Sequence, residues 1–422
     1  MKVMVVGGGG REHALVQALK KSPKITKLYA LPGNGGIGRD AECVNIGAKD
    51  LDGIVSFAKE NSIDFAVVAP DDPLVLGAVD RLEEIGIPCF GPKKDAAIIE
   101  GSKVFSKNLM KQYGIPTAFY EVFTEMESAL EYLKTAPIPT VIKADGLALG
   151  KGVIIAETRE DAVDAVRSMM EDKIFGESGS QIVIEEFLTG PEVSVLCFTD
   201  GKTLIPMISS MDHKRALDGD EGLNTGGMGT VAPNPYYTPR IADECMETIF
   251  MPTIRAMEQE NRTFKGCLYF GLMLTEKGPK VIEYNCRFGD PETQVVLPLL
   301  KSDLFDIMEH IANGTLDQAN VSFSDQSACC VIVASGGYPT SYQSGYEMTL
   351  PEPGEDEMIY IAGAKEQNGK LYTAGGRVLG ATAIADDLQG AIKKAYALTE
   401  KISFTDAHYR KDIGQRALKA LQ

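Results

Sequence analysis

The first hundred residues alternate short apolar segments with helical ones, and this rhythm constrains the fold more than any other feature of the chain. Strands are predicted at 2–6, near Leu28 and at 65–69, with helices beginning at Arg11 and at about Asp50. Strands and helices that alternate in this way form a parallel, doubly wound sheet. Ligands of such sheets bind at the carboxyl ends of the strands, where we expect a site.

Three loops rich in glycine or proline follow these strands, at 7–10, 32–36 and 70–73, and are expected to line one crevice. The first resembles a dinucleotide fingerprint, but that pattern needs glycine at position 12, where the chain has Glu12, so an oxidoreductase is disfavoured. The amides of this loop can instead hold one phosphate at a helix start. A turn that only lets strand and helix pack closely is the alternative.

The size and charge of the chain exclude several classes of protein. A chain of 422 residues is too long for one core, so roughly two to four domains are expected. The net charge of -17 disfavours a nucleic acid partner. The eight cysteines lack metal spacing, the N-terminal apolar run is too short for a secretory signal, and no run suits a membrane span. A cytoplasmic protein with free thiols is predicted.

A glycine-rich segment at 146–152 lies between two strand-like segments, TVIKADG and GVIIAET, which are expected to form an antiparallel pair with a flexible tip. It is not a Walker A loop, because only three residues separate Gly146 from Gly150 and Gly152 stands where Ser or Thr would hold Mg²⁺. It is predicted to fold over nucleotide phosphates, with Lys143 as a charge partner. A mobile hairpin with a surface lysine is the alternative.

The segment 281–294 (VIEYNCRFGDPETQ) is a strand that carries polar groups on one face. Strict alternation places Val281, Glu283, Asn285 and Arg287 on that face and Ile282, Tyr284 and Cys286 toward the core. An acid and an amide oxygen two residues apart suit Mg²⁺, and Arg287 can hold an anionic group. The next turn adds Asp290 and Glu292, more carboxylates than a merely wet edge strand needs.

The middle of the chain is less informative. The segments 181–188 and 191–198 are expected to pair as strands. The acids at their break, Glu185, Glu186 and Glu192, are compatible with ribose binding, but this pattern alone favours an ordinary surface. A long polar excursion at 212–229 is typical of a functional or disordered loop. His213 has no identified partner in it and is interpreted as a hydrogen-bonding residue. Single helices are predicted at 238–260 and 292–313, with a separate small domain after Asp325.

Motifs along the whole chain, in order, resemble the phosphoribosylamine–glycine ligase (glycinamide ribonucleotide synthetase) family of the ATP-grasp superfamily. They are GGREHAL, GSK, VIKADGLALGKGV, VIEEFL, DHKR, NTGGMG, RFGDPETQ, GGRV and RKDIG. The resemblance implies a doubly wound N-terminal domain at 1–101, an ATP-grasp domain at 102–325 with a glycine-rich lid subdomain at about 121–190, and a small mixed C-terminal domain at 326–422. RFGDPETQ is the most specific of these motifs.

The resemblance also implies an activity, in which ATP phosphorylates glycine and the amine of 5-phosphoribosylamine displaces the phosphate, giving glycinamide ribonucleotide. ATP and Mg²⁺ or Mn²⁺ are the implied co-substrate and metal, and a monomer or weak homodimer without nucleic acid or membrane partners is expected. Such chemistry needs positioning, charge neutralisation and exclusion of water, and no protein nucleophile.

The residues that the resemblance assigns fall into four groups. ATP contacts are expected from Lys103, Lys143, Gly146, Gly150, Lys151, Glu185, Phe187, Leu188 and Glu192. Metal ligands are Glu283 and Asn285, and the catalytic group is Arg287, Lys143 and Asp290. Substrate contacts are expected from Gly9, Gly10, Asn34, Gly35, Asp71, Asp212, Lys214, Thr225 and Gly226.

Four departures from the family pattern stand out. Asp71-Asp72 replaces the usual Glu-Ala, Leu223 replaces Pro, Phe270 replaces Ala, and 361–364 reads IAGA where HAGT is usual. None touches the metal face. The rival hypotheses are an ATP-grasp enzyme that phosphorylates a different acid, such as bicarbonate, and a nucleotide sensor without turnover. RFGDPETQ with NTGGMG disfavours the first, and intact Glu283, Asn285 and Lys143 disfavour the second.

Overall fold

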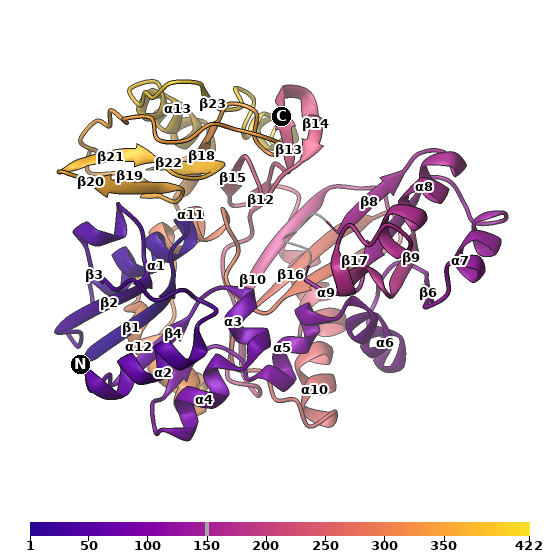
Figure 1. Ribbon diagram of the computed structural model, residues 1–422, viewed down its shortest axis with the longest axis horizontal. Coiled ribbons are helices and arrows are strands. Elements are labelled where there is room, and N and C mark those ends of the chain that lie inside the picture. Colours follow the sequence, from indigo (N-terminus) through magenta and orange to yellow (C-terminus); the bar gives the residue numbers. More distant parts are fainter. Residues whose placement is uncertain (148–151) are drawn as a thin grey trace.

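A computed structural model describes residues 1–147 and 152–422 of the chain (Figure 1). The N-terminal region is a five-stranded parallel sheet of order β3-β2-β1-β4-β5, which confirms the predicted doubly wound fold. Its strands are β1 (Lys2–Gly7), β2 (Lys27–Pro32), β3 (Glu42–Cys43), β4 (Phe65–Val68) and β5 (Cys89–Phe90). Its helices are α1 (Gly10–Leu19), α2 (Leu51–Glu60), α3 (Asp71–Leu76), α4 (Ala78–Glu84) and α5 (Lys94–Gly101).

A second sheet of four strands, in the order β6-β9-β7-β8, stands apart at one end of the molecule (Figure 1). Its elements are β6 (Tyr120–Phe123), α7 (Met126–Leu133), β7 (Thr140–Ala144), β8 (Val153–Ala156), α8 (Arg159–Met170) and β9 (Ile182–Glu186), and they share their own apolar core. The predicted antiparallel pair β7–β8 is confirmed. Most of its predicted flexible tip, including Gly150 and Lys151, lies outside the described residues.

The central sheet has the order β11-β10-β16-β17 and consists of β10 (Glu192–Thr199), β11 (Leu204–Pro206), β16 (Gly266–Thr275) and β17 (Gly278–Asn285). The prediction that 181–188 pairs with 191–198 is wrong, because β9 belongs to the second sheet and β10 pairs with β16. The chain changes sheets at Gly190, where φ is 145° and an added Cβ would lie 2.1 Å from the carbonyl oxygen of Leu274. Only glycine fits such a close approach.

Because β17 contains a β-bulge, two of its residues point to faces other than those predicted. Gly271 pairs with Glu283 while the next residue, Leu272, pairs with Val281, so Ile282 is the extra residue. Two residues of a bulged strand then oppose one on the partner, which shifts the alternation. Val281 is fully buried in the core, whereas Ile282 lines the same cavity as Glu283, the reverse of the prediction for both. Glu283, Asn285 and Arg287 keep their common face.

The middle region was predicted to contain two single helices, and the structure divides each of them into shorter elements. The segment 238–260 is helical throughout, but a π-helical turn η4 (Met246–Phe250) separates α9 (Pro239–Cys245) from α10 (Met251–Gln259). The segment 292–313 is not one helix: α11 (Thr293–Val296) and a 3₁₀ turn η5 (Leu297–Leu299) end before Asp303, whose side chain caps α12 (Leu304–Asn313). The capping carboxylate begins a new helix, since it accepts the free backbone N–H groups at its start.

The C-terminal region builds a sheet of order β12-β15-β18-β22-β19, with β23 on β18. Its strands are β12 (Met211–Asp212), β15 (Gly229–Ala232), β18 (Ser327–Ser335), β19 (Glu357–Ile361), β22 (Arg377–Ala385) and β23 (Ala407–His408). Two hairpins, β13 (Arg215–Leu217) with β14 (Glu221–Asn224) and β20 (Ala364–Gln367) with β21 (Lys370–Thr373), and helices α13 (Leu388–Thr399) and α14 (Gln415–Ala420) complete it. The sheet therefore includes two strands from the excursion at 212–229 and its flanks.

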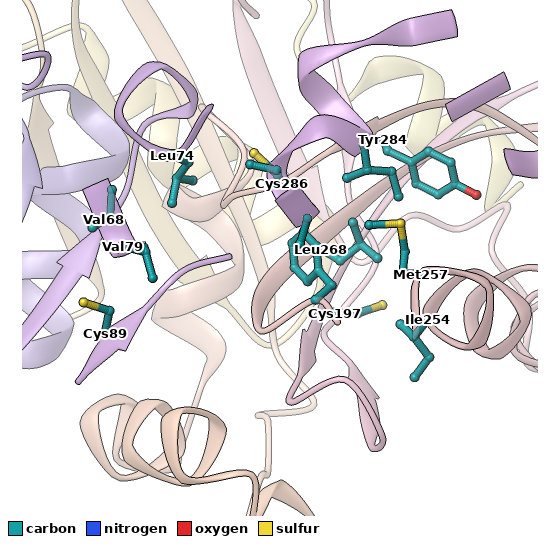
Figure 2. Close-up of a cluster of buried hydrophobic side chains, with 14 of the residues drawn as sticks. Val68, Leu74, Val79, Cys89, Cys197, Ile254, Met257, Leu268, Tyr284 and Cys286 are labelled. Carbon is teal, nitrogen blue, oxygen red and sulfur yellow. The ribbon is translucent and has the colours of Figure 1, made fainter. Parts of the chain in front are cut away.

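One buried cluster joins the N-terminal and central regions (Figure 2). Val68 and Leu74 from the N-terminal region share it with Leu268 and Tyr284 of the central sheet and with Met257 of α10. Because a close-packed core is rigid, this cluster fixes the position of the N-terminal loops relative to the central sheet. Phe270, one of the departures, is fully buried here with its ring 4.4 Å from that of Phe250, and therefore fills core space outside the candidate site.

All eight cysteines are free, and seven of them are buried. Among the described residues, no helix has both the length and the apolar character needed to cross a membrane.

Candidate active site

A cavity rich in charged groups lies between α5, α6 (Lys103–Tyr113), β7, β9 and β17, and we call it the lysine cavity. Its charged and amide side chains are Lys103, Lys107, Lys143, Asp71, Glu100, Glu185, Glu283, Asn285 and Arg287. The structure thus brings together predicted residues from five separate segments of the chain. Gly146 lies beside Lys103, whose Nζ donates a hydrogen bond to the Gly146 carbonyl oxygen at 3.0 Å.

Glu185 is held between two buried lysines. Its Oε1 lies 3.1 Å from Lys143 Nζ and its Oε2 lies 3.1 Å from Lys107 Nζ. Lys107 also donates to Thr117 Oγ1 at 2.8 Å, and burial lowers the pKa of its ammonium group to about 8. Burial, followed by repulsion from Lys143, lowers the pKa of Lys103. Buried ammonium groups that crowd one another in this way favour a bound anion.

Glu283 extends from the bulge of β17 toward Lys214. The Lys214 Nζ lies 3.6 Å from Glu283 Oε1 and 3.4 Å from Glu192 Oε2, so one ammonium group bridges two acids. Burial acts to raise the pKa of Glu283, but the neighbouring lysines, Lys214 first, outweigh it and lower that pKa. The carboxylate is therefore ionised and available to a cation.

Glu283 and Asn285 offer a carboxylate and an amide oxygen to a metal ion. The Asn285 Oδ1 accepts a hydrogen bond from Arg287 Nη2 at 3.1 Å, so its oxygen faces the cavity side of the strand. The described part of the chain holds no cluster of three or more His, Cys, Asp or Glu side chains that could enclose a metal. A carboxylate and an amide oxygen alone suit Mg²⁺, which keeps waters and takes oxygens from a phosphate ligand. The donor set fits such an ion.

Glu100 was not predicted from the sequence. Its Oε1 lies 2.9 Å from Arg287 Nη2, and its Oε2 accepts a hydrogen bond from the Cys286 N–H at 2.7 Å. Burial raises the pKa of Glu100. Asp71 lies farther from the same guanidinium, at 3.9 Å. The sequence signal that could have revealed Glu100 is an acid inside the apolar run AAIIEG. The contact with Glu100 fixes the direction of the Arg287 guanidinium across the cavity.

The second cluster surrounds Asp290, and we call it the Asp290 junction; it comprises Gly9–Arg11, 225–227, Asp290, Gln294, Tyr338 and Arg377. The carboxylate of Asp290 accepts hydrogen bonds from the Arg11 N–H at 3.2 Å and from Gln294 Nε2 at 2.8 Å, and lies 3.5 Å from Arg377 Nη2. Three parts of the fold therefore meet at one side chain.

The glycine loop before α1 is tied by its own neighbours. The Gly9 N–H donates to Glu12 Oε2 at 2.6 Å, and an added Cβ at Gly10 would lie 2.8 Å from Gln294 Nε2. Asn34 donates to the carbonyl oxygens of Gly8 and Ile361 at 3.0 and 2.8 Å, which links both glycine loops to β19. The Gly35 N–H donates to the Ala364 carbonyl oxygen at 3.0 Å. These predicted substrate residues line the contact between N- and C-terminal regions.

The excursion at 212–229 places Lys214 beside Glu192 and Glu283 and contributes Thr225 and Gly226 to the Asp290 junction. Thr225 Oγ1 donates to the Lys214 carbonyl oxygen at 2.8 Å. Asp212 is half-buried, and its partial burial together with the nearby Glu292 raises its pKa. Burial likewise raises the pKa of Glu292, whose Oε1 accepts a hydrogen bond from the Tyr269 hydroxyl at 3.2 Å. Two carboxyls with raised pKa values lie beside the Lys214 ammonium group.

His213 makes hydrogen bonds through both ring nitrogens. Nδ1 lies 3.0 Å from the Gly229 carbonyl oxygen, and Nε2 accepts from the Gly414 N–H at 3.1 Å. Burial lowers the pKa of this imidazole to about 4. A neutral ring with both nitrogens occupied fits the interpretation as a hydrogen-bonding residue.

The remaining predicted residues lie where β9 leaves its sheet. The ring of Phe187 is 39% exposed, Leu188 is half-buried, and Glu192 is exposed and faces Lys214. A partly exposed aromatic ring beside a charged cavity is compatible with stacking on a planar ligand. Each role assigned to these residues stays a prediction.

Comparisons with known proteins match the chain along nearly its whole length. Three family models fit, the N domain of phosphoribosylglycinamide synthetase at 1–100, its ATP-grasp (A) domain at 101–293 and its C domain at 328–416. A phosphoribosylamine–glycine ligase of Caldanaerobacter subterraneus is 47% identical over 413 residues, 98% of this chain and 99% of that protein. One of Haemophilus influenzae is 46% identical, with 99% of each chain covered.

Solved structures agree with these matches. The crystal structure of a phosphoribosylamine–glycine ligase from Thermotoga maritima superimposes with a TM-score of 0.86 at 35% identity, covering 98% of this chain and 100% of that one. The biotin carboxylase domain of a Hydrogenobacter thermophilus carboxylase has a TM-score of 0.76 at 16% identity, which indicates a shared fold only. The ATP-grasp expectation is confirmed, and the chain belongs to the phosphoribosylglycinamide synthetase family.

Proposed function

We propose that this chain is a phosphoribosylamine–glycine ligase. It joins glycine to 5-phosphoribosylamine through glycyl phosphate and converts ATP to ADP and phosphate, as a step of purine biosynthesis. The observation that carries the proposal is the meeting of the lysine cavity with the Lys214 bridge and the Asp290 junction, in a chain whose full-length relatives bear this name. One cluster suits a triphosphate, and the other faces the two loops expected to hold the amine.

In this proposal the lysine cavity binds ATP. Lys103 and Lys143 neutralise the phosphates, and Arg287, held by Glu100, stays directed at the transferring phosphoryl group. Phosphoryl transfer depends mainly on positioning and on such charge neutralisation. Gly146, Gly150 and Lys151 cover the phosphates, Glu185, Phe187 and Leu188 contact the adenine, and Glu192 contacts the ribose.

The fold family implies a divalent metal, and Glu283 with Asn285 are the residues that would hold it. When bound, Mg²⁺ or Mn²⁺ would neutralise charge on the phosphate oxygens. The chain's own part is to keep Glu283 ionised through its lysine neighbours and to direct the Asn285 amide oxygen to the same side.

The acceptor side is assigned to the region between Lys214 and the Asp290 junction. The carboxylate of glycine attacks the γ-phosphorus and ADP leaves; the amine then attacks the carbonyl carbon and phosphate leaves, with loss of one amine proton. Asp212, Lys214, Thr225 and Gly226 are proposed to line the glycine and amine, and Gly9, Gly10, Asn34, Gly35 and Asp71 the ribosylamine. Asp290 orders this region through its contacts.

The same proposal includes the division into domains at 1–101, 102–325 and 326–422, with the lid subdomain at about 121–190. A cytoplasmic location is supported by eight free cysteines, since reducing compartments keep thiols unpaired. We further propose a monomer or weak homodimer that acts on small molecules, without nucleic acid or membrane partners; the net charge of -17 disfavours polyanions.

The experiment is a coupled assay of the purified chain with ATP, Mg²⁺, glycine and freshly generated phosphoribosylamine. We expect ADP release only when both glycine and the amine are present, together with glycinamide ribonucleotide detected by mass spectrometry. Omission of each substrate in turn is the control. Equal ADP release with bicarbonate or with other amino acids would contradict the glycine assignment, and nucleotide binding without any turnover would support a sensor instead.

A further inference from the structure

The C-terminal region bonds both backbone polar atoms of one residue, Gly226, in the glycine loop at 225–227. The Gly226 N–H donates a hydrogen bond to the Tyr338 hydroxyl at 3.1 Å, and the Gly226 carbonyl oxygen accepts one from Arg377 Nη1 at 2.8 Å. These partners lie 112 and 151 residues away along the chain. The peptide units on either side of Gly226 are thus each tied to the C-terminal region by a hydrogen bond.

The same guanidinium also holds the RFGDPETQ turn. Arg377 Nη1 donates to the Asp290 carbonyl oxygen at 2.9 Å, and Nη2 lies 3.5 Å from Asp290 Oδ1. Burial acts to lower the pKa of Arg377, but Asp290 and other anionic groups outweigh it, so the pKa is raised and the charge is retained. The planar fork of arginine makes such divergent bonds from one side chain, which lysine cannot do.

The glycines of the loop are explained by this contact. An added Cβ at Gly226 would lie 2.9 Å from Arg377 Cζ, and one at Gly227 would lie 2.5 Å from Pro291 Cδ and 2.7 Å from Asp212 Oδ1. Gly227 also has φ of 119°, a conformation that other residues rarely adopt. The loop is therefore wedged between Arg377 on one side and the 290–291 turn with Asp212 on the other.

We propose that Arg377 and Tyr338 are positioning residues of the C-terminal region, which fix the 225–227 loop against Asp290 and so order the acceptor side of the site without contributing to nucleotide binding. The inference rests on the proposed ligase function. Within the described residues, the side-chain polar contacts of Arg377 and Tyr338 are to the glycine loop and the 290 turn, and neither residue lines the lysine cavity. Loss of these contacts should affect glycine and the amine and spare ATP.

Kinetics separate this role from a merely structural one. For Arg377→Ala we expect kcat/KM for glycine and for phosphoribosylamine to fall by about 100-fold, as misplacement of a reacting group can cost. The Kd for ATP, measured by titration without the other substrates, should stay within about threefold. Methylguanidinium should restore part of the acceptor activity, and Arg377→Lys should restore less than it does. Tyr338→Phe, which removes one hydrogen bond, should lose about tenfold or less.

Arg410 provides a matched control. It is a buried arginine of the same region that also reaches back along the chain, to Asp220 Oδ1 at 3.0 Å and to the Arg215 carbonyl oxygen at 3.1 Å, but it does not touch Asp290 or Gly226. Arg410→Ala should lower the urea midpoint without changing acceptor kcat/KM per folded molecule. If Arg377→Ala behaves like Arg410→Ala, or if its ATP affinity falls as much as its acceptor kcat/KM, the proposal is wrong.

Hydrogen exchange tests these contacts without turnover. In Arg377→Ala, peptides covering 224–229 should exchange faster than in the unaltered chain, while those covering α6 should not. Should Arg377→Ala fail to fold, Gly226→Ala tests the same contact from the other side. It should likewise speed exchange at 224–229 and leave exchange in α6 unchanged. Unchanged exchange at 224–229 overturns the proposal. Absence of ligation by the unaltered chain is a separate result, which overturns the proposed function itself.

Discussion

The lysine cavity and the Asp290 junction are both built from buried or partly buried charges, yet they pair those charges differently. In the cavity, Lys143 and Lys107 share one carboxylate, and the contact of Glu283 with Lys214 is long, at 3.6 Å. In the junction, the Asp290 carboxylate accepts hydrogen bonds from Arg11 and Gln294 and lies near Arg377, while both backbone polar atoms of Gly226 are bonded.

The difference indicates a division of labour. Groups with shared or long contacts can exchange a protein partner for a ligand at little cost, whereas removing a partner from a fully bonded, partly buried group leaves the other partner unsatisfied. Substitutions in the cavity should therefore lower activity more than stability. Substitutions in the junction should lower both.

The largest expected effect is that of Glu283→Gln. The change removes a negative charge from the face proposed to hold the metal, and we expect kcat to fall by about 1000-fold with an unchanged urea midpoint. Turnover should be measured over a range of Mg²⁺ concentrations. The exposed Glu276, at the turn between β16 and β17, gives the control Glu276→Gln. Near-normal activity of Glu283→Gln at limiting Mg²⁺ would refute the metal role.

Asp290→Asn is the matching change in the junction. The amide keeps the shape but loses the charge that faces Arg377, and because Arg11 and Gln294 donate to different oxygens, the amide nitrogen takes the place of one acceptor and one of the two bonds is lost. We expect the free energy of unfolding to fall by about 1–3 kcal/mol together with a loss of activity. An Asp290→Asn protein as stable as the unaltered chain would break the comparison between the two clusters.

A smaller effect separates the two lysines of the cavity. Lys143 and Lys107 lie at the same 3.1 Å distance from Glu185 and are both buried, so each replacement by Met should cost similar stability. Only Lys143 is proposed to reach the phosphates. We expect Lys143→Met to lower kcat/KM for ATP by about 100-fold and Lys107→Met by about tenfold or less. Equal losses of kcat/KM would show that both lysines act through Glu185 alone.

Much of the fold could be predicted from the sequence because its determinants are local. The parallel N-terminal sheet follows from the spacing of apolar segments, and Glu283, Asn285 and Arg287 follow from alternation along one strand. The bulge at Ile282 could not be predicted, since it depends on how β17 pairs with Gly271 of β16. Pairing between strands is a tertiary property.

Several site residues were not predicted for the same reason, because their roles depend on tertiary packing. Glu100 and Lys107 lie on helices whose sequence gives no sign that both face a cavity until β9 and β17 pack against them. Arg377 and Tyr338 contact Gly226 across more than a hundred residues. A motif match drew attention to the GGRV segment, but only the packing of β22 beside the glycine loop reveals what its arginine holds.

The smallest effect on activity is expected for His213, whose two ring nitrogens are both hydrogen-bonded. Its pKa is about 4 in the folded chain, against about 6.5 for a free imidazole, so between these values the unfolded chain binds a proton that the folded chain does not. Stability is therefore lost as pH falls from 6.5 to 4, by up to about 3 kcal/mol, and is fully present above pH 6.5.

The measurement is urea unfolding of the unaltered chain and of His213→Gln across this range of pH. The variant should be less stable at pH 7.5, because it leaves Gly229 or Gly414 without its partner, but its stability should fall less steeply on acidification. His310→Gln is the control, since that ring is 28% exposed on α12 and lies away from the junction. Activity per folded molecule should be equal at pH 7.5. Parallel stability curves for the unaltered chain and His213→Gln would mean that the ring is protonated inside the fold, and that its bonds to Gly229 and Gly414 are not those of a neutral imidazole.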